Sequence, residues 1–204
     1  MASNDLVHVV DDDVEVRKSL GFLLATADFA VRLYESASAF LATATGNLDG
    51  CIVTDVRMPG IDGIEFLRQL RSRGHSIPVI VMTGHADVAL AVQAMKEGAA
   101  DFIEKPFDDD ILIDAIRSAL DNRSQADATH PQTKEIHTRL STLSERERQV
   151  LDGLVSGLPN KTIAYDLGIS PRTVEIHRAN VMSKMGASSL SHLVRMALIV
   201  ESNF

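Results

Sequence analysis

A chain of 204 residues is long for one domain and short for two large ones, which favours one large and one small domain. Its 45% hydrophobic and 24% charged residues are typical of a globular protein. The net charge of −8 comes from residues 1–125, which contain 11 Lys or Arg and 20 Asp or Glu, whereas residues 126–204 contain 9 and 8. This distribution argues against a protein that coats nucleic acid along its whole length, but it permits a small DNA-reading module at the end.

The cysteine and hydropathy patterns predict a cytoplasmic protein. The single cysteine, Cys51, cannot form an internal disulfide, and its apolar neighbours favour a buried structural thiol in a reducing compartment. No apolar run approaches the ~18 residues that a membrane span requires. The N-terminus also lacks the basic patch and hydrophobic segment of a secretion signal, so we expect no membrane partner.

Five short apolar runs alternate with helical patterns in the first part of the chain. The runs span residues 7–10, 30–34, 51–54, 78–82 and 101–103. Helical spacing follows each run, over residues 16–24, 36–41, 62–73, 87–97 and 108–122. Continuous apolar runs are typical of strands covered on both faces. The alternation therefore predicts an α/β domain over residues 1–122, with a five-stranded parallel doubly wound sheet.

Residues 123–138 are predicted to be a linker. Apolar periodicity is lost there, Ser, Gln, Thr, His and Pro131 become frequent, and helical spacing is partial, over residues 134–140. Only helical patterns remain in residues 139–204, which predicts an all-α domain of four helices.

Capping signals mark three helix starts in this second domain. Ser144 and Glu147 have the spacing of a capping box at the first helix. Asn160 is expected to cap the second helix, which ends at Gly168. Ser170 is expected to cap the third, with a proline in its first turn.

Acidic, hydroxyl and amino side chains follow four of the predicted strands. Asp11 and Asp12 follow the first strand, Asp55 the third, Thr83 the fourth and Lys105 the fifth. The carboxyl ends of parallel strands share one edge of the sheet, so we expect these residues to converge. Carboxylates suit Mg²⁺ and can attack phosphorus, while an ammonium and a hydroxyl stabilise the transferring group. The pattern predicts a phosphoryl-acceptor site.

Residues 5–122 resemble the receiver domain of two-component response regulators. The resemblance rests on the segments Asp11-Asp12, Asp55 with Met58-Pro59-Gly60, Thr83-Gly84 and Lys105-Pro106. It implies a flavodoxin-like fold, a sensor histidine kinase as phosphodonor and Asp55 as phosphoacceptor. It also implies phosphoryl contacts from Thr83 and Lys105, and Mg²⁺ binding by Asp11, Asp12, Asp55 and the backbone carbonyl of Arg57.

The same resemblance implies a phosphorylation switch. Phe102 occupies the switch-aromatic position, and because it lacks a hydroxyl its inward and outward states must differ by packing alone. We hypothesise that phosphate on Asp55 draws Thr83 inward, that Phe102 fills the vacated space, and that the changed surface favours a dimer. Members of this family dimerise through the segments that correspond to residues 87–97 and 108–122.

A magnesium-dependent phosphohydrolase is the enzyme alternative. Asp11 and Asp13 stand two residues apart, like the nucleophile and acid/base of haloacid-dehalogenase-type enzymes. That alternative predicts covalent phosphate on Asp11 and rapid turnover, whereas a receiver takes a phosphoryl group on Asp55 and holds it. We expect the receiver, and therefore a protein that is not an enzyme.

A helix-turn-helix pattern lies at about residues 160–179. Ala164, Gly168 and Val174 supply the small residue at a helix crossing, the turn glycine and the apolar anchor of the second helix. About residues 139–202 resemble the LuxR-type DNA-binding domain, through Leu143 to Glu147, Gly157, Asn160-Lys161, Ile163-Ala164, Thr173-Val174, His177 and Lys184 to Gly186. The resemblance implies duplex promoter DNA and RNA polymerase as partners.

Helical geometry separates two faces of the recognition helix. At 100° per residue, Val174, Val181 and Met185 share the buried side. The expected base-facing side chains are Arg172, Glu175, Ile176, Ala179 and Ser183, with Asn180 at the edge. An exposed Ile176 can contact a thymine methyl group, and Glu175 can accept from a cytosine amino group. The expected phosphate contacts are Lys161, Thr173, His177 and Lys184.

Two questions about the second domain stay open at this stage. The terminal helices could bind protein or RNA instead of duplex DNA. In the last helix, Ala197 and Leu198 could complete the core or form a dimer seam.

Overall fold

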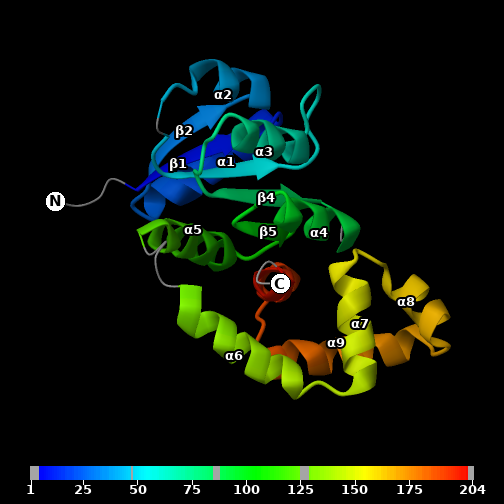
Figure 1. Cartoon of the computed structure of the whole chain (residues 1–204). Helices are drawn as coiled ribbons and strands as arrows, with labels where there is room; N and C mark the ends of the chain where they lie inside the picture. The colour runs from blue at the N-terminus through cyan, green and yellow to red at the C-terminus, as the bar shows by residue number, and fades with distance from the viewer. Residues whose placement is uncertain (1–4, 47, 85–87, 125–128, 202–204) are drawn as a thin grey trace. The chain divides into compact units, whose positions relative to one another are not determined.

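The computed structural model describes residues 5–46, 48–84, 88–124 and 129–201 (Figure 1). By its contacts the chain divides into two units, one of residues 1–86 with 97–125 and one of residues 87–96 with 126–204. No helix among the described residues is long and apolar enough to cross a membrane.

The sheet of the first unit has five parallel strands in the order β2-β1-β3-β4-β5, as a flavodoxin-like fold requires. The strands are β1 (Leu6–Val10), β2 (Ala30–Tyr34), β3 (Cys51–Asp55), β4 (Val79–Thr83) and β5 (Asp101–Glu104). The predicted α/β fold is therefore confirmed. In register, Val10 pairs with Thr54 and Asp55 with Met82, so the carboxyl ends of these central strands are level.

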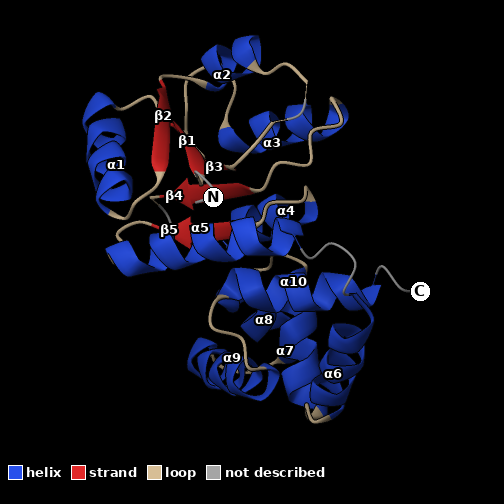
Figure 2. Ribbon diagram, turned by 90° about the vertical axis from the view of Figure 1, so that its left-hand side faces the viewer, coloured by secondary structure: helices blue, strands red, loops and turns tan. Residues whose placement is uncertain are grey.

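Helices cover both faces of this sheet (Figure 2). They are α1 (Val14–Thr26), α2 (Ala37–Thr43), α3 (Gly63–Ser72) and α5 (Asp109–Ser124); α4 (Val88–Lys96) lies between β4 and β5 in the chain and is grouped with the second unit. Alternate strand residues such as Val7, Val9 and Val53 pack with α1 and α5 in one buried cluster. Burial on both faces explains why the central strands β3 and β4 are nearly continuous apolar runs, whereas the edge strands β2 and β5 are more exposed.

Gly63 lets α3 begin directly against the end of β3. Its backbone N–H donates to the carbonyl of Val56 over 2.8 Å. A Cβ at this position would collide with the carbonyl oxygen of Asp55 and lie 3.0 Å from the Cα of Val56. Both neighbours are backbone atoms, so they cannot rotate away, and the start of α3 is coupled to the position of Asp55.

Gly63→Ala should therefore destabilise the chain by about 1–3 kcal/mol, the usual cost of overpacking a filled site. Urea unfolding of the full chain measures the change. Gly84→Ala is the matched control, because no described atom lies within 4 Å of a Cβ there. Equal stability of Gly63→Ala and wild type would contradict this account of the turn.

The second unit has its own buried core around the helix-turn-helix. Its elements after α4 are α6 (Thr129–Ser141), α7 (Glu145–Val155), α8 (Asn160–Leu167), α9 (Pro171–Met185) and α10 (Leu190–Glu201). The helical fold and the partial helix within residues 134–140 are confirmed, but α6 is longer than that and occupies much of the predicted linker. Ile136 of α6 is buried in the same core as Val150, Val174 and Met185.

Two of the three predicted caps are confirmed. Ser144 and Glu147 form both hydrogen bonds of a capping box, and Ser170 caps α9 through the backbone N–H of Thr173. The prediction that Asn160 caps α8 is wrong. Pro159 is the N-cap residue, since its carbonyl accepts the first helical hydrogen bonds, and no side chain caps this helix.

Candidate functional site

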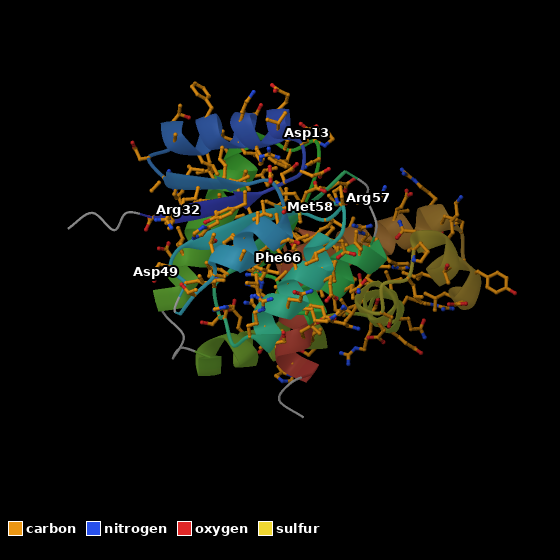
Figure 3. The ribbon with its side chains drawn as sticks, turned by 90° about the horizontal axis from the view of Figure 1, so that it is seen from above. Asp13, Arg32, Asp49, Arg57, Met58 and Phe66 are labelled. Atoms are coloured by element: carbon orange, nitrogen blue, oxygen red, sulfur yellow. The ribbon has the colours of Figure 1, made fainter. Side chains whose placement is uncertain are left out.

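Three charged side chains from distant parts of the chain meet at the carboxyl edge of the sheet. The ammonium of Lys105 lies 2.6 Å from Oδ1 of Asp55 and 3.4 Å from Oδ2 of Asp11. Figure 3 shows neighbouring residues Asp13, Arg57 and Met58 gathered at this end, opposite Asp49. The structure thus brings together three of the predicted site residues, with the carboxylates of Asp11 and Asp55 on the ammonium of Lys105.

Asp11 is the most enclosed of these groups, with 3% of its side chain exposed. Its Oδ1 accepts the backbone N–H of Asp13 over 2.9 Å, and Arg17 donates to its backbone carbonyl over 2.6 Å. Burial raises the pKa of Asp11 and outweighs the hydrogen bond from Asp13 and the charge of Lys105, which lower it. A cation beside this carboxylate therefore offsets its desolvation.

Lys105 is fixed through both its backbone and its side chain. Its backbone N–H donates to the carbonyl of Thr83 over 2.6 Å, which ties the residue to the end of β4. Burial lowers the pKa of Lys105, but the hydrogen bond to Asp55 and the charges of Asp55 and Asp11 raise it more, so the pKa lies above its ordinary value. The ammonium consequently stays charged where a phosphoryl group would need it.

The remaining oxygens of the site suit a hard divalent cation. Asp12 is exposed directly after Asp11, and the second oxygen of Asp55 accepts the backbone N–H of Arg57 over 2.6 Å. Among the described residues, no group of three or more His, Cys, Asp or Glu side chains is arranged around a metal position. Mg²⁺ commonly binds through one or two carboxylates and retains several waters, so this donor set fits it.

Thr83 and Phe102 lie on the same face of the sheet. Thr83 pairs with Glu104 and Val81 pairs with Phe102 in register, which makes Thr83 and Phe102 diagonal neighbours. Thr83 is 1% exposed, whereas Phe102 is only partly buried. The register therefore places the two predicted switch residues close together on one face of the sheet.

Asp13 has a local role at this edge. It is the N-cap of α1, and its Oδ1 accepts the backbone N–H groups of Glu15 and Val16. These hydrogen bonds lower the pKa of Asp13, with that from Glu15 the largest cause. A helix-capping carboxylate of low pKa is poorly suited to be the general acid of a phosphohydrolase.

The predicted recognition helix α9 has the two faces that its sequence indicates. Val174, Val181 and Met185 are fully buried. All six predicted base-facing residues are exposed, namely Arg172, Glu175, Ile176, Ala179, Asn180 and Ser183. Ile176 is 53% exposed although it is apolar, and Arg172 forms a 3.2 Å ion pair with Glu175 one turn away. The pair leaves the acidic Glu175 partly neutralised on this face.

The predicted phosphate contacts lie in different surroundings. Lys161 is exposed in the first turn of α8, and Thr173 and His177 are partly buried on α9. The hydroxyl of Thr173 lies 2.9 Å from that of Ser170. Lys184 is the exception, because its ammonium lies 2.6 Å from the buried carboxylate of Glu147.

Comparison with known proteins decides the family. Residues 7–117 match the response regulator receiver domain, and residues 141–197 match the bacterial regulatory proteins of the luxR family. The transcriptional regulatory protein FixJ of Rhizobium meliloti (strain 1021) is 59% identical over 192 residues, which cover 94% of each chain. This chain belongs to the FixJ-like response regulators. It is a phosphorylation-activated, DNA-binding regulator of transcription in a two-component system.

Other relatives of this FixJ-like regulator agree over nearly its whole length. FixJ of Azorhizobium caulinodans is 59% identical over 193 residues, covering 95% of this chain and 92% of that protein. The crystal structure of full-length FixJ from B. japonicum is 49% identical and covers 98% of this chain and 99% of that one, with a TM-score of 0.59. The response regulator StyR is 40% identical and covers 95% and 98%, with a TM-score of 0.56.

Three contacts with the site or the recognition helix were not expected from the sequence, although Glu147 itself was predicted to be part of a capping box. Arg17 holds the backbone of Asp11, Glu147 binds Lys184, and Arg139 donates to the carbonyl of Met185. A basic residue in the first turn of the helix after Asp11 could have drawn attention to Arg17. The contacts of Glu147 and Arg139 join residues 37 and 46 positions apart and leave no periodic signal.

Glu147 should make the stability of this FixJ-like regulator depend on pH. The hydrogen bond from Lys184, followed by that from the backbone of Ser144, lowers the pKa of Glu147 from 4.5 to about 2. A carboxyl group with a depressed pKa stabilises the fold above its unfolded value and loses that contribution as the pH falls. The stability difference between wild type and Glu147→Gln should therefore be full above pH 4.5 and vanish towards about pH 2.

Urea unfolding of both proteins as a function of pH measures this difference. Subtracting one stability curve from the other cancels the contribution of the other carboxylates, which protonate over the same pH range. A difference that stayed constant from pH 7 to 2 would mean that the ion pair does not set the pKa of Glu147.

Proposed function

We propose that Asp55 accepts a phosphoryl group from the phosphohistidine of a sensor kinase. A carboxylate oxygen of Asp55 bonds to phosphorus, the phosphorus–nitrogen bond breaks, and its electron pair leaves on the imidazole nitrogen. The single observation that carries this proposal is the ammonium of Lys105, which lies 2.6 Å from Asp55 and is shared with Asp11. That ammonium can bind the phosphoryl oxygens and offset their charge, while the hydroxyl of Thr83 donates a hydrogen bond to one of them.

Asp11, Asp12, Asp55 and the backbone carbonyl of Arg57 would hold Mg²⁺ at this edge. Bound there, the ion would offset the negative charge of the transferring group and of the carboxylates around it. Asp11 supports this assignment, because a carboxylate with 3% exposure needs nearby positive charge. Lys105 supplies one positive charge for the two carboxylates Asp11 and Asp55, so a bound cation would balance the second. The proposed cofactor is therefore Mg²⁺, with Asp55 as acceptor and not as a group that turns over substrate.

Phosphorylation acts on the output through Thr83 and Phe102 in this proposal. Thr83 moves towards the acyl phosphate, and Phe102, its diagonal neighbour, packs into the space that Thr83 leaves. The altered surface over residues 87–97 and 108–122 shifts an existing equilibrium towards a homodimer. Ile111 of α5, which is 51% exposed, supplies an apolar side chain for that surface.

The dimer would place two α9 helices one DNA turn apart on promoter DNA. Arg172, Glu175, Ile176, Ala179, Asn180 and Ser183 face the bases, and Lys161, Thr173 and His177 contact phosphates. Bound in this way, the protein would recruit RNA polymerase. Residues 1–122 act as the receiver, 123–138 as the connection and 139–204 as the DNA-binding domain.

The resemblance to FixJ suggests the biological setting. We propose a FixL-like histidine kinase as the partner, a cytoplasmic location, and activation of nitrogen-fixation genes under low oxygen. The support for this setting is the 59% identity to FixJ over nearly the whole of both chains.

Locating the acyl phosphate by mass spectrometry tests the core of this proposal. Protein treated with acetyl phosphate and Mg²⁺ should carry the label on Asp55, and chelation of the metal before treatment should prevent it. Label on Asp11 with rapid release of phosphate would instead support the phosphohydrolase. Selecting bound sequences from random duplexes with the phosphorylated protein would then define the operator.

A further inference from the structure

The C-terminal end of α9 is held by three charged side chains, Arg139, Glu147 and Lys184, which we call the α9 clamp. Lys184 donates to Oε2 of Glu147 over 2.6 Å and to the carbonyl of Thr142 over 3.3 Å. Arg139 donates to the carbonyl of Met185, the last residue of the helix. The clamp therefore ties the recognition helix to the segment that joins α6 and α7.

Glu147 has two tasks in this arrangement. The same oxygen that binds Lys184 also accepts the backbone N–H of Ser144 over 2.7 Å, completing the capping box of α7. Its side chain is only 5% exposed. A carboxylate that is buried this deeply requires a charged partner, and Lys184 is the cation that lies on it. The start of α7 and the end of α9 are consequently joined through one carboxylate.

Arg139 of the α9 clamp packs against Gly186, the residue that follows α9. Gly186 adopts a left-handed conformation with φ 65° and ends α9. The guanidinium of Arg139 occupies the space that a side chain at position 186 would fill. Cations at a helix C-terminus also interact favourably with the helix dipole, so Arg139 and Lys184 both stabilise this end.

These contacts point to a role for Lys184 other than the expected phosphate contact. A lysine that contacts phosphate should have a solvated ammonium, as exposed Lys161 at the start of α8 offers; no salt bridge to it is found among the residues that the structure describes. The ammonium of Lys184 instead lies on a buried carboxylate, whose charge would repel a phosphate group. The pair is neutral as a whole, so it contributes little attraction for the DNA backbone.

We infer that Glu147, acting through Lys184, is a positioning residue that sets the orientation of the recognition helix α9, and that Lys184 serves this internal pair instead of a DNA phosphate. The inference rests on the proposed function in one respect, because it takes α9 as the helix that reads the bases. It replaces the sequence-based expectation that Lys184 contacts a phosphate, because this lysine, with 40% of its side chain exposed, pairs with a carboxylate of its own chain.

Salt-dependent binding to duplex DNA separates the two roles of Lys184. The proteins are full-length wild type, Glu147→Gln, Lys184→Met, the double variant and Lys161→Met, all treated with acetyl phosphate. The probe is a fluorescent duplex that the phosphorylated wild type selects from a random pool. Thermal unfolding of each protein confirms that it is folded at the assay temperature.

A positioning pair gives a distinctive result. Glu147→Gln and Lys184→Met should each weaken binding by about tenfold, a change that corresponds to roughly 1.4 kcal/mol. Both should leave the slope of log affinity against log salt unchanged, and the double variant should bind no worse than the weaker single variant. Lys161→Met is the matched control, because loss of a phosphate contact should reduce that slope by about 1.

Two results would overturn the inference while the proposed function stands. Tighter binding by Glu147→Gln, together with a slope reduced by about 1 in Lys184→Met, would show that Lys184 is a phosphate contact that Glu147 competes for. Unchanged affinity of folded Glu147→Gln would show that the pair supports stability alone. Failure of the phosphorylated wild type to select any duplex would instead overturn the proposed base-reading role of α9 and this inference with it.

Discussion

Asp55→Asn should abolish phosphodonor-dependent dimerisation and promoter binding. An amide is not a nucleophile for phosphorus, so no acyl phosphate forms and the equilibrium stays with the unphosphorylated state. Moving a two-state equilibrium from 1:99 to 99:1 takes about 5.5 kcal/mol. The variant loses the part of this free energy that phosphorylation supplies in the wild type. Sedimentation velocity with and without acetyl phosphate, followed by binding to the selected duplex, measures both effects.

Asp62→Asn is the matched control for this experiment. Asp62 is the N-cap of α3 and lies in the loop that follows Asp55 at the end of β3, and asparagine caps a helix as well as aspartate does. The control should dimerise and bind like wild type. Undiminished phosphodonor-dependent dimerisation of Asp55→Asn would show that the switch does not work through this residue.

Ile176→Asp should remove sequence-specific DNA binding while leaving the fold intact. The side chain is 53% exposed, so its replacement opens no cavity and should scarcely alter thermal stability. Loss of a base contact costs about 1–3 kcal/mol, and the new carboxylate adds repulsion from the DNA phosphates. Specific affinity should therefore fall by at least about tenfold, measured by titration of the phosphorylated variant against the selected duplex.

Ile176→Val controls for the chemistry of the side chain, because it keeps an apolar surface that can contact a thymine methyl group. We expect this variant to retain most of the specific affinity. If Ile176→Asp bound the selected duplex as tightly as wild type, the face of α9 opposite Val174 would not be the base-reading face.

The receiver could be predicted well because its signals are local and strong. Buried parallel strands need continuous apolar residues on both faces, so runs such as Val79 to Met82 identify strands without any knowledge of their neighbours. The right-handed crossover then restricts the topology and places Asp11, Asp55 and Lys105 at one edge. The faces of α9 follow equally directly from the helical period, as the burial of Val174, Val181 and Met185 confirms.

The wrong cap and the unexpected length of α6 both arose where local signals compete. Asparagine is a favoured cap, which suggested Asn160, yet the extended backbone of Pro159 (φ −68°, ψ 151°) makes it the residue before the first helical turn. The segment before residue 139 is polar and contains a proline, which suggested a linker. Ile136 nevertheless packs into the helical core, and this tertiary contact favours the longer helix α6.

The sequence alone therefore determined the order and type of the secondary structure, the edge at which the acidic residues gather, and the exposed face of the recognition helix. Only the tertiary structure decided which charges pair. Lys105 reaches Asp11 across 94 positions and Asp55 across 50, and Lys184 reaches Glu147 across 37. Periodicity reports which side of one element is buried, whereas the partner of a charge depends on how separate elements pack, and burial then makes that pairing necessary.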